Sequence, residues 1–278
     1  MNAWWNGRVQ PIAEVRISPL DHGFLVGDGV FETLVARNGV PLAARRHWKR
    51  LMRSCEAMGM GCLSEEAYWE ALNAVLREND LSEARLRVTI TSGDGPLGSG
   101  RGSSELNCAV VAAALNPWPE SEKVVTSPWP VHESSALAGV KSTSYGANVR
   151  SLAFAKAKGC GEALLLNSRN EICEGTGSNV FVVVAGRVKT PPLTAGCLAG
   201  TTREMVLEAC ADAGWMIEET DLPSSVLSEC EEAFLTSSTR HVHPISEING
   251  RSLSPVPGPV TKRVQELYAA KAMSEPAW

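Results

Sequence analysis

The chain has 278 residues, of which 44% are hydrophobic and 21% are charged, and its formal net charge is −5. This composition is typical of a globular protein with one large domain or two domains of ordinary size. The negative charge gives no electrostatic reason to expect nucleic-acid or anionic-membrane binding. No apolar run approaches the roughly 18 residues of a membrane span, and the first residues lack the basic and apolar regions of a signal peptide. We therefore expect neither a nucleic-acid nor a membrane partner.

Eight cysteines are spread along the chain, with no Cys-x-x-Cys pair and no histidine at metal-ligand spacing. Several lie in apolar stretches, such as Cys108 within Leu106–Val111. Buried thiols that act as small hydrophobic side chains explain this distribution better than a disulfide framework does. The sequence therefore predicts free cysteines, no metal site and a reducing, cytoplasmic setting.

The first part of the chain mixes strand and helix patterns. Residues 30–37 alternate apolar and polar side chains, as a strand does, and Asn38-Gly39 is a hairpin-turn pair. Residues 45–58 carry apolar side chains at helical spacing. The elements predicted here are strands at 30–37, 40–43, 85–91 and 106–114, and helices at 45–58 and 65–78.

Two prolines at 117 and 119 break both kinds of element, so Asn116–Glu120 is the best linker candidate. Beyond it we predict strands at 123–127, 162–166, 179–184 and 232–236, and helices near 148–158, 201–213 and 259–273. Strands and helices follow one another irregularly, which favours an α+β fold over a regular βαβ array. We expect a smaller N-terminal α+β domain at 1–116 and a larger C-terminal α+β domain at 117–278.

Four segments carry the polar and glycine residues of a possible active site: Leu20–Thr33, Gly139–Tyr145, Glu174–Phe181 and Ala199–Arg203. A lone Gly-x-Gly, as in the first of them, is weak evidence for any function. In this order, however, the four segments closely resemble those of the class-IV aminotransferases, from about residue 18 to residue 245. That family includes branched-chain aminotransferases, D-amino-acid aminotransferases and aminodeoxychorismate lyases.

This resemblance implies a two-domain α+β enzyme of fold type IV, similar to the D-amino-acid aminotransferases. It also implies pyridoxal 5'-phosphate as cofactor, a small amino compound as substrate and a homodimer with the site at the domain junction. Trp4, Trp5 and Phe24 give modest independent support for the dimer, because large apolar side chains in segments of weak local structure need a surface to cover them. A core within one chain is the alternative cover.

Of the eight lysines, only Lys141 follows an apolar stretch, Ala136–Val140, rather than sitting on a polar helix face. An arbitrary lysine is a solvated surface residue far more often than a catalytic one. The resemblance places Lys141 at the position of the lysine that carries the cofactor as a Schiff base. Burial would favour the neutral amine of such a lysine, which can attack an aldehyde and later move a proton.

The resemblance also assigns two residues to the cofactor's ring. Glu174 precedes a Gly-Thr-Gly turn, where a merely solubilising glutamate would be equally comfortable. In the matched segment it is the carboxylate expected to keep the ring nitrogen protonated. Tyr145 is expected to contact the ring's 3-oxygen, although its spacing from Lys141 differs by one residue from the tyrosine of branched-chain enzymes.

The cofactor's phosphate requires hydrogen-bond donors. Thr201 and Thr202 open a predicted helix directly after Gly200, and a helix N-terminus presents unpaired amides to an anion. A plain threonine N-cap would need no ligand. By resemblance Arg50 is the phosphate-binding arginine and Ser238 is a further phosphate donor; without the resemblance they would pass as a solvated arginine and part of a polar turn.

The loop Thr91–Gly102 contains five glycines and Arg101, and it is similar to the glycine-rich, arginine-containing loop of aminodeoxychorismate lyases. Arg101 could bind a substrate carboxylate with two hydrogen bonds. A flexible hairpin with an exposed arginine is the alternative. This loop predicts a 4-amino-4-deoxychorismate lyase that releases 4-aminobenzoate and pyruvate, a step of folate biosynthesis.

Two other functions remain open. An aminotransferase acting on branched-chain, D-amino acid or (R)-amine substrates would keep the cofactor and change only the partner compound. A non-catalytic member of the family would bind the cofactor or only a protein partner, but loss of Lys141 or Glu174 would be expected there, and both residues are present.

Overall fold

A computed structural model describes residues 1–102 and 105–276. Within them the chain forms two compact units. The N-terminal unit comprises Met1–Asn116, Val140–Tyr145 and residues 275–276, and the C-terminal unit comprises Pro117–Gly139 and Gly146–Ser274. Each unit has its own sheet and its own apolar core.

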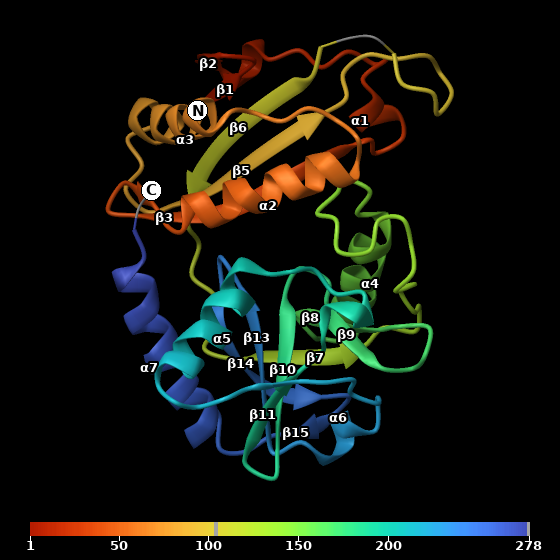
Figure 1. The fold of residues 1–278 in the computed structure, drawn as a ribbon, viewed down its shortest axis with the longest axis vertical. Coiled ribbons are helices and arrows are strands. Elements are labelled where there is room, and N and C mark those ends of the chain that lie inside the picture. Colours follow the sequence, from red (N-terminus) through yellow and green to blue (C-terminus); the bar gives the residue numbers. More distant parts are fainter. Residues whose placement is uncertain (103–104, 277–278) are drawn as a thin grey trace. The chain divides into compact units, whose positions relative to one another are not determined.

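The N-terminal unit is built on a six-stranded antiparallel sheet with the order β2-β1-β6-β5-β3-β4. Figure 1 shows α2 and α3 beside this sheet, and they pack on β3 and on β1 and β6, respectively. Its elements are β1 (Asn2–Trp5), β2 (Arg8–Pro11), the 3-10 helix Ile12–Glu14, α1 (His22–Leu25), β3 (Gly29–Arg37), β4 (Val40–Pro41), α2 (Ala44–Ala57), α3 (Glu65–Glu78), β5 (Ala84–Thr91) and β6 (Asn107–Ala114).

Side-chain alternation explains this sheet. Along β5 the apolar residues Leu86, Val88 and Ile90 are fully buried, and the polar residues between them are not. Such a strand places one face on the core and leaves the other for polar side chains. The helix α3 begins where Ser64 accepts a hydrogen bond from the amide of Ala67, as an N-cap residue does.

The C-terminal unit is built on a nine-stranded sheet with the order β12-β11-β10-β13-β14-β7-β8-β9, and β15 pairs with β14. The pairs β11–β12, β14–β7 and β7–β8 are parallel, and the others are antiparallel. Its strands are β7 (Glu122–Thr126), β8 (Glu162–Leu166), β9 (Ile172–Gly175), β10 (Asn179–Val184), β11 (Arg187–Thr190), β12 (Glu218–Glu219), β13 (Glu232–Ser237), β14 (His241–Ile248) and β15 (Arg251–Ser252).

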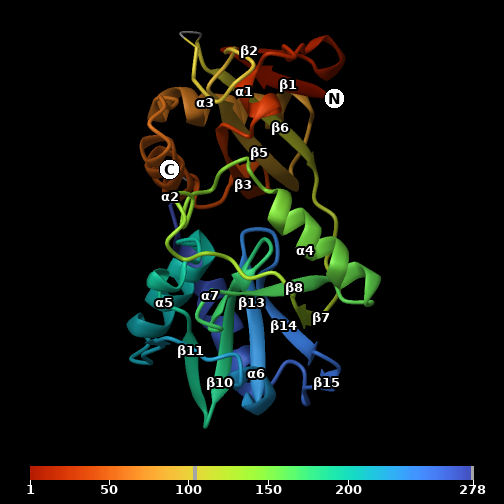
Figure 2. The ribbon, with the colours of Figure 1, turned by 90° about the vertical axis from the view of Figure 1, so that its right-hand side faces the viewer.

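Helices pack against this second sheet. Figure 2 shows α5 and α7 side by side, and α7 also packs on β13 and β14, whereas α4 packs on β7 and β8. The helices are α4 (Gly146–Ala157), the 3-10 helix Leu193–Ala195, α5 (Thr201–Asp212), α6 (Val226–Glu229) and α7 (Pro259–Ser274). In the core the rings of Phe181 on β10 and Phe234 on β13 stack with centroids 4.9 Å apart.

The α+β prediction is confirmed, and so is the prediction of free cysteines. All thirteen predicted elements are present with small differences at their ends. The structure adds strands that the sequence patterns did not predict, among them β9 and β14. In β14 the proline at 244 argues against an inner strand, yet Pro244 lies opposite Phe234 between two neighbouring strands.

The segment that carries Lys141 lies with the N-terminal unit, whereas the sequence placed this lysine in the C-terminal domain. Its backbone explains the difference. The amide of Phe31 on β3 donates to the carbonyl of Lys141 at 2.9 Å, and the amide of Thr143 donates to the carbonyl of Gly29 at 2.8 Å. Residues 140–145 thus continue the edge of the N-terminal sheet at β3.

Trp4 is only 6% exposed in the core of its own unit, so an intrachain core covers this tryptophan. Phe24, in contrast, is 72% exposed. In the described part of the chain no helix has both the length and the apolar character that a membrane crossing requires. Residues 1–102 and 105–276 also hold no cluster of three or more His, Cys, Asp or Glu side chains arranged for a metal ion.

Candidate active site

Lys141 is a buried lysine beside two aromatic rings. Its side chain belongs to a residue that is 9% exposed, and Nζ lies 4.3 Å from the ring centroid of Phe31 and 5.7 Å from that of Tyr145. The two rings meet edge to face with centroids 5.0 Å apart. The backbone amide of Lys141 donates to the hydroxyl of Ser54 on α2 at 3.3 Å. The backbone of Lys141 is therefore fixed beside α2, and its side chain is shielded from bulk solvent.

The first two sequence segments meet at this lysine. The hydroxyls of Thr143 and Ser144 donate to the carbonyl of Gly27 at 2.8 and 3.0 Å. A Cβ atom at Gly27 would lie 2.6 Å from the Ser144 hydroxyl, and one at Gly29 would lie 2.6 Å from the carbonyl of Ile90. Gly27 therefore allows a close approach of the lysine segment, and Gly29 allows a close approach of β5.

Arg50 lies on α2 and forms a fully buried ion pair with Glu32 on β3. Its Nε and one terminal nitrogen donate to the two carboxylate oxygens of Glu32, both at 2.7 Å, and Nδ1 of His47 lies 2.7 Å from the same carboxylate. Burial raises the pKa of Glu32, but the charges and hydrogen bonds of Arg50 and His47 outweigh it and hold that pKa far below the usual range. Arg50 is thus fixed in place by Glu32, a partner that the sequence reasoning did not identify.

Arg87 on β5 is a further residue that the sequence reasoning missed. Its guanidinium carbon lies 3.5 Å from the ring centroid of Phe31, the ring that Lys141 also contacts, and its Nε donates to the hydroxyl of Thr89. Burial lowers its pKa. Within the described residues no carboxylate forms an ion pair with it. The sequence pattern does not distinguish Arg87 from Arg85, which lies on the same face of the strand.

Arg101 was predicted as a substrate-binding residue, and the structure pairs it with an acidic residue of its own unit. Its Nε and a terminal nitrogen donate to the two carboxylate oxygens of Asp28, both at 2.6 Å. Its other terminal nitrogen donates to the carbonyl of Gly59 at 2.8 Å. The hydrogen bonds of Arg101 lower the pKa of Asp28. A substrate carboxylate would have to compete with Asp28 for this arginine.

In the C-terminal unit Glu174 lies on β9, next to β8, and its side chain is oriented by two donors. The amide of Leu198 and the side-chain amide of Asn179 donate to Oε2 of Glu174 at 3.0 and 3.3 Å. The third and fourth sequence segments meet here, since Leu198 directly precedes Ala199–Arg203. The carboxylate is therefore attached to the segment that leads into α5.

Thr201 and Thr202 form the first turn of α5, and each is 4% exposed. Gly200 stands at the N-cap and has no side chain with which to cap the helix. The hydroxyls of Thr201 and Ser238 lie 3.5 Å apart. The structure thus brings the three predicted phosphate donors of this unit together at one helix N-terminus, where backbone amides favour an anion.

The turn after Glu174 is held by a buried carboxylate. Glu162 on β8 accepts hydrogen bonds from the amide and the hydroxyl of Thr176 and, at 3.3 Å, from the hydroxyl of Ser178. A terminal nitrogen of Arg240 lies 3.4 Å from the same carboxylate. Glu162 thereby connects the turn at 175–178 to the turn between β13 and β14, which contains Ser238 and Arg240.

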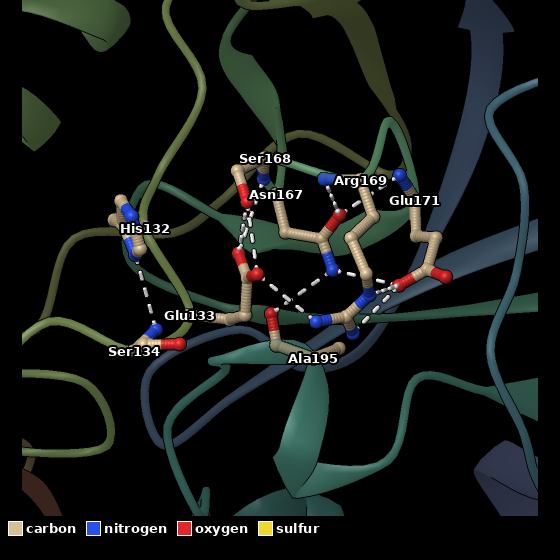
Figure 3. A network of polar contacts seen from close by, with 8 residues as sticks. All are labelled: His132, Glu133, Ser134, Asn167, Ser168, Arg169, Glu171 and Ala195. Carbon is tan, nitrogen blue, oxygen red and sulfur yellow. Dashed lines mark hydrogen bonds and ion pairs between the residues drawn. The ribbon is translucent and has the colours of Figure 1, made fainter.

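A second polar network of this unit surrounds the turn between β8 and β9 (Figure 3). Arg169 lies between two carboxylates, 3.0 Å from Glu133 and 2.8 Å from Glu171. The side-chain amide of Asn167 donates to Glu171 at 2.8 Å. Glu133 accepts hydrogen bonds from its own backbone amide and from Ser168, and these bonds lower the pKa of its carboxyl group to about 2. This network fastens the turn to the segment around Glu133, and none of its residues belongs to the predicted site.

The buried His243 on β14 is expected to make the folded protein less stable at acid pH. Burial, with a smaller effect of the nearby Arg240 charge, lowers its pKa to about 4. In an unfolded chain a histidine has a pKa of about 6.5. Between these values the unfolded chain binds a proton that the folded protein does not, so stability rises with pH in this window and is lost as the pH falls.

We therefore expect His243→Gln to weaken the pH dependence of folding. Going from pH 7 to pH 5, the wild-type protein should lose about 2 kcal/mol more stability than the variant, at about 1.4 kcal/mol per pH unit below 6.5. Urea unfolding at both pH values measures this difference. Other titrating groups are common to both proteins and cancel. Equal losses in the two proteins would contradict the prediction.

Comparison with known proteins agrees with this arrangement. The family model described as amino-transferase class IV matches residues 29–248. The chain is 30% identical to a branched-chain-amino-acid aminotransferase of Pseudomonas aeruginosa (95% of this chain, 91% of that one). It is 29% identical to a D-alanine aminotransferase of Bacillus licheniformis (100% and 99%) and 27% identical to an aminodeoxychorismate lyase of Bacillus subtilis (95% and 92%).

Solved structures show the same fold. The T.th. branched-chain amino acid aminotransferase, solved with pyridoxamine 5'-phosphate, matches with a TM-score of 0.91 at 26% identity. The match covers 99% of this chain and 95% of that one. The branched-chain aminotransferase of Thermoproteus uzoniensis, solved with norvaline, has a TM-score of 0.89 at 28% identity (97% and 93%). The chain therefore belongs to the class-IV aminotransferase family and is a pyridoxal-phosphate-dependent enzyme of fold type IV.

Proposed function

We propose that this enzyme is an aminotransferase that takes the amino group of an apolar amino acid, with a branched-chain amino acid as the first substrate class to test. The observation that carries the proposal is the position of Arg87. This cation lies on the same aromatic ring as Lys141, and no carboxylate of the described residues pairs with it. It can therefore bind the carboxylate of an amino acid, while Phe31 and Tyr145 offer apolar surface.

The residues present fit pyridoxal phosphate. Lys141 supplies a buried amine, and Glu174 supplies a carboxylate whose orientation two hydrogen bonds fix. The first turn of α5 supplies amides and hydroxyls for a phosphate at Thr201 and Thr202. When bound, the cofactor supplies an electron sink for the carbon that bears the amino group.

The protein's own residues supply the remaining chemistry. Lys141 would bind the cofactor's aldehyde through Nζ and then carry a proton to and from the substrate at the same atom. Glu174 would hold a proton on the ring nitrogen. Arg50, fixed by Glu32, would bind the phosphate, with Ser238 as a further donor, and Tyr145 would contact the ring's 3-oxygen. Because Arg101 already pairs with Asp28, Arg87 is the better candidate for the substrate carboxylate.

The relatives support an aminotransferase, since four of the five proteins named above are aminotransferases, three for branched-chain amino acids and one for D-alanine. The deciding experiment compares two assays on the purified enzyme. One follows amino transfer from L-leucine, L-isoleucine, L-valine or D-alanine to 2-oxoglutarate, and the other follows pyruvate release from aminodeoxychorismate. We expect transfer from the apolar L-amino acids; pyruvate release alone would overturn the proposal.

A 4-amino-4-deoxychorismate lyase is the second candidate, favoured by the glycine-rich loop with Arg101 and by the 27% identity to a named lyase. In this alternative Arg101 leaves Asp28 to bind a substrate carboxylate. Arg101→Ala would then reduce pyruvate release without displacing the cofactor. In the aminotransferase proposal the same variant leaves transfer from leucine largely unchanged.

We expect Arg87→Leu to weaken the use of amino acid substrates. A bidentate bond to a carboxylate contributes roughly 1.5–3 kcal/mol, so kcat/KM for the best amino acid should fall by about 10- to 100-fold while the cofactor stays bound. Arg85→Leu is the matched control on the same face of β5, at an exposed position. Equal losses in both variants would exclude a specific role for Arg87.

We further propose that the enzyme is a homodimer, as the family resemblance implies. Phe24 is 72% exposed, and Leu20 and Val26 in the same segment are 43% and 47% exposed, which leaves apolar surface to cover. Sedimentation equilibrium measures the association directly. Purely monomeric protein at micromolar concentration would contradict the dimer.

A further inference from the structure

Asn179, the first residue of β10, connects two parts of the candidate site in the C-terminal unit. The residue is 5% exposed, and its side-chain amide nitrogen donates to Oε2 of Glu174 at 3.3 Å and to the carbonyl of Leu198 at 2.9 Å. The amide of Leu198 in turn donates to the same oxygen of Glu174 at 3.0 Å. Asn179, Glu174 and Leu198 therefore form a closed set of hydrogen bonds.

The other side of the Asn179 side chain lies against the start of α5. A Cβ atom at Gly200 would overlap Oδ1 of Asn179. Gly200 has an ordinary φ of −69°, so its backbone conformation does not require glycine. Glycine is required at position 200 because the side chain of Asn179 occupies the space that a Cβ atom would need. The absence of a side chain at Gly200 and the presence of one at Asn179 are thus complementary.

We propose that Asn179 is a positioning residue that sets the carboxylate of Glu174 and the N-terminal turn of α5 relative to each other. The inference rests on the proposed roles of Glu174 at the ring nitrogen and of Thr201 and Thr202 at the phosphate. One side chain then fixes both ends of the cofactor site in this unit, without itself being needed for the chemistry.

An amide is the side chain that these partners require. Its nitrogen carries two hydrogens, which suffice for one carboxylate oxygen and one backbone carbonyl. An aspartate of the same shape would place an oxygen against the carbonyl of Leu198 and a second negative charge beside Glu174. Both contacts are repulsive, so Asn179→Asp should disturb the two ends of the site together.

Two measurements read the two ends separately. The preference of the cofactor-free protein for pyridoxal phosphate over pyridoxal, from absorbance titrations, reports the phosphate end. We expect this preference to fall about tenfold in Asn179→Asp, since one charged hydrogen bond contributes roughly that factor. The pH at which the visible band of the bound cofactor titrates reports the ring end. It should rise by about one pH unit, because a neighbouring negative charge favours protonated forms.

The chain offers a matched control in the network of Figure 3. Asn167 donates to Oε2 of Glu171 at 2.8 Å and to the carbonyl of Ala195 at 3.5 Å, so it binds one carboxylate and one backbone carbonyl as Asn179 does. Asn167→Asp therefore adds the same charge and loses the same donor in the same unit. It should lower the melting temperature and leave both cofactor measurements as in the wild-type protein.

Gly200→Ala provides a second variant that adds no charge. Its methyl group displaces Asn179 from the other side, so Glu174 loses a hydrogen-bond donor and its negative charge acts more strongly on the ring. Both measurements should therefore shift in the same directions as in Asn179→Asp. If wild-type protein binds no pyridoxal phosphate, the proposed function itself fails. If wild-type protein binds it and either measurement stays unchanged in both Asn179→Asp and Gly200→Ala, the positioning role is wrong and the proposed function stands.

Discussion

Replacing Lys141 by alanine is expected to abolish turnover and the borohydride-reducible bond between protein and cofactor. The amine of Lys141 is buried against Phe31 and Tyr145, and alanine supplies no amine in its place. Covalent binding and proton transfer both depend on it, and general acid–base catalysis alone contributes typically 10²–10⁴-fold in rate. A loss of at least about 10⁴-fold in kcat is therefore expected.

The fold should survive this substitution. The segment is held by backbone bonds, such as the one from the amide of Phe31 to the carbonyl of Lys141, and alanine retains them. Lys158→Ala is a suitable control, because Nζ of Lys158 also lies over an aromatic ring, 5.1 Å from the centroid of Phe154. Circular dichroism checks the fold of both variants. A Lys141→Ala protein that keeps an appreciable fraction of wild-type turnover would require another lysine at the cofactor.

Periodic patterns carried most of the fold prediction. The helix Glu65–Glu78 and the strands Glu162–Leu166 and Asn179–Val184 have the predicted ends, because long periodic runs between clear breaks leave little choice of boundary. The missed strands are short or contain breakers. Ile172–Gly175 has four residues, and His241–Ile248 contains Pro244. Tertiary packing, which a local pattern does not contain, overrides the local preference at such places.

The candidate site was predicted by resemblance rather than by local pattern. In the structure the matched segments meet in pairs: Thr143, in the lysine segment, forms hydrogen bonds with Gly27 and Gly29, and Glu174 accepts one from Leu198, before α5. The ion-pair partners of the predicted site residues could not be predicted. Glu32 stands 18 residues from Arg50, and Asp28 stands 73 residues from Arg101. Such pairs depend on the register of neighbouring strands and on loop conformation, which no single segment encodes.

Replacing Glu174 by glutamine is expected to leave the cofactor bound and to remove most of the catalysis. The side-chain oxygen of glutamine can still accept the hydrogen bonds from Leu198 and Asn179, so the geometry of the segment before α5 should persist. The negative charge is lost, and a neutral amide no longer favours a proton on the ring nitrogen. A loss of roughly 100- to 1,000-fold in kcat, about 3–4 kcal/mol at 1.4 kcal/mol per tenfold, should follow.

Glu171→Gln is the matched control for this experiment, since Glu171 also accepts a hydrogen bond from an asparagine side chain and lies in the same unit. It removes an ion pair with Arg169 and should affect stability rather than rate. Stopped-flow measurement of the first half-reaction, with the cofactor absorbance as signal, separates chemistry from cofactor loss. An unchanged rate in Glu174→Gln would show that another acidic group serves the ring nitrogen, because the substitution removes the negative charge at position 174 and keeps one oxygen for the donors Leu198 and Asn179.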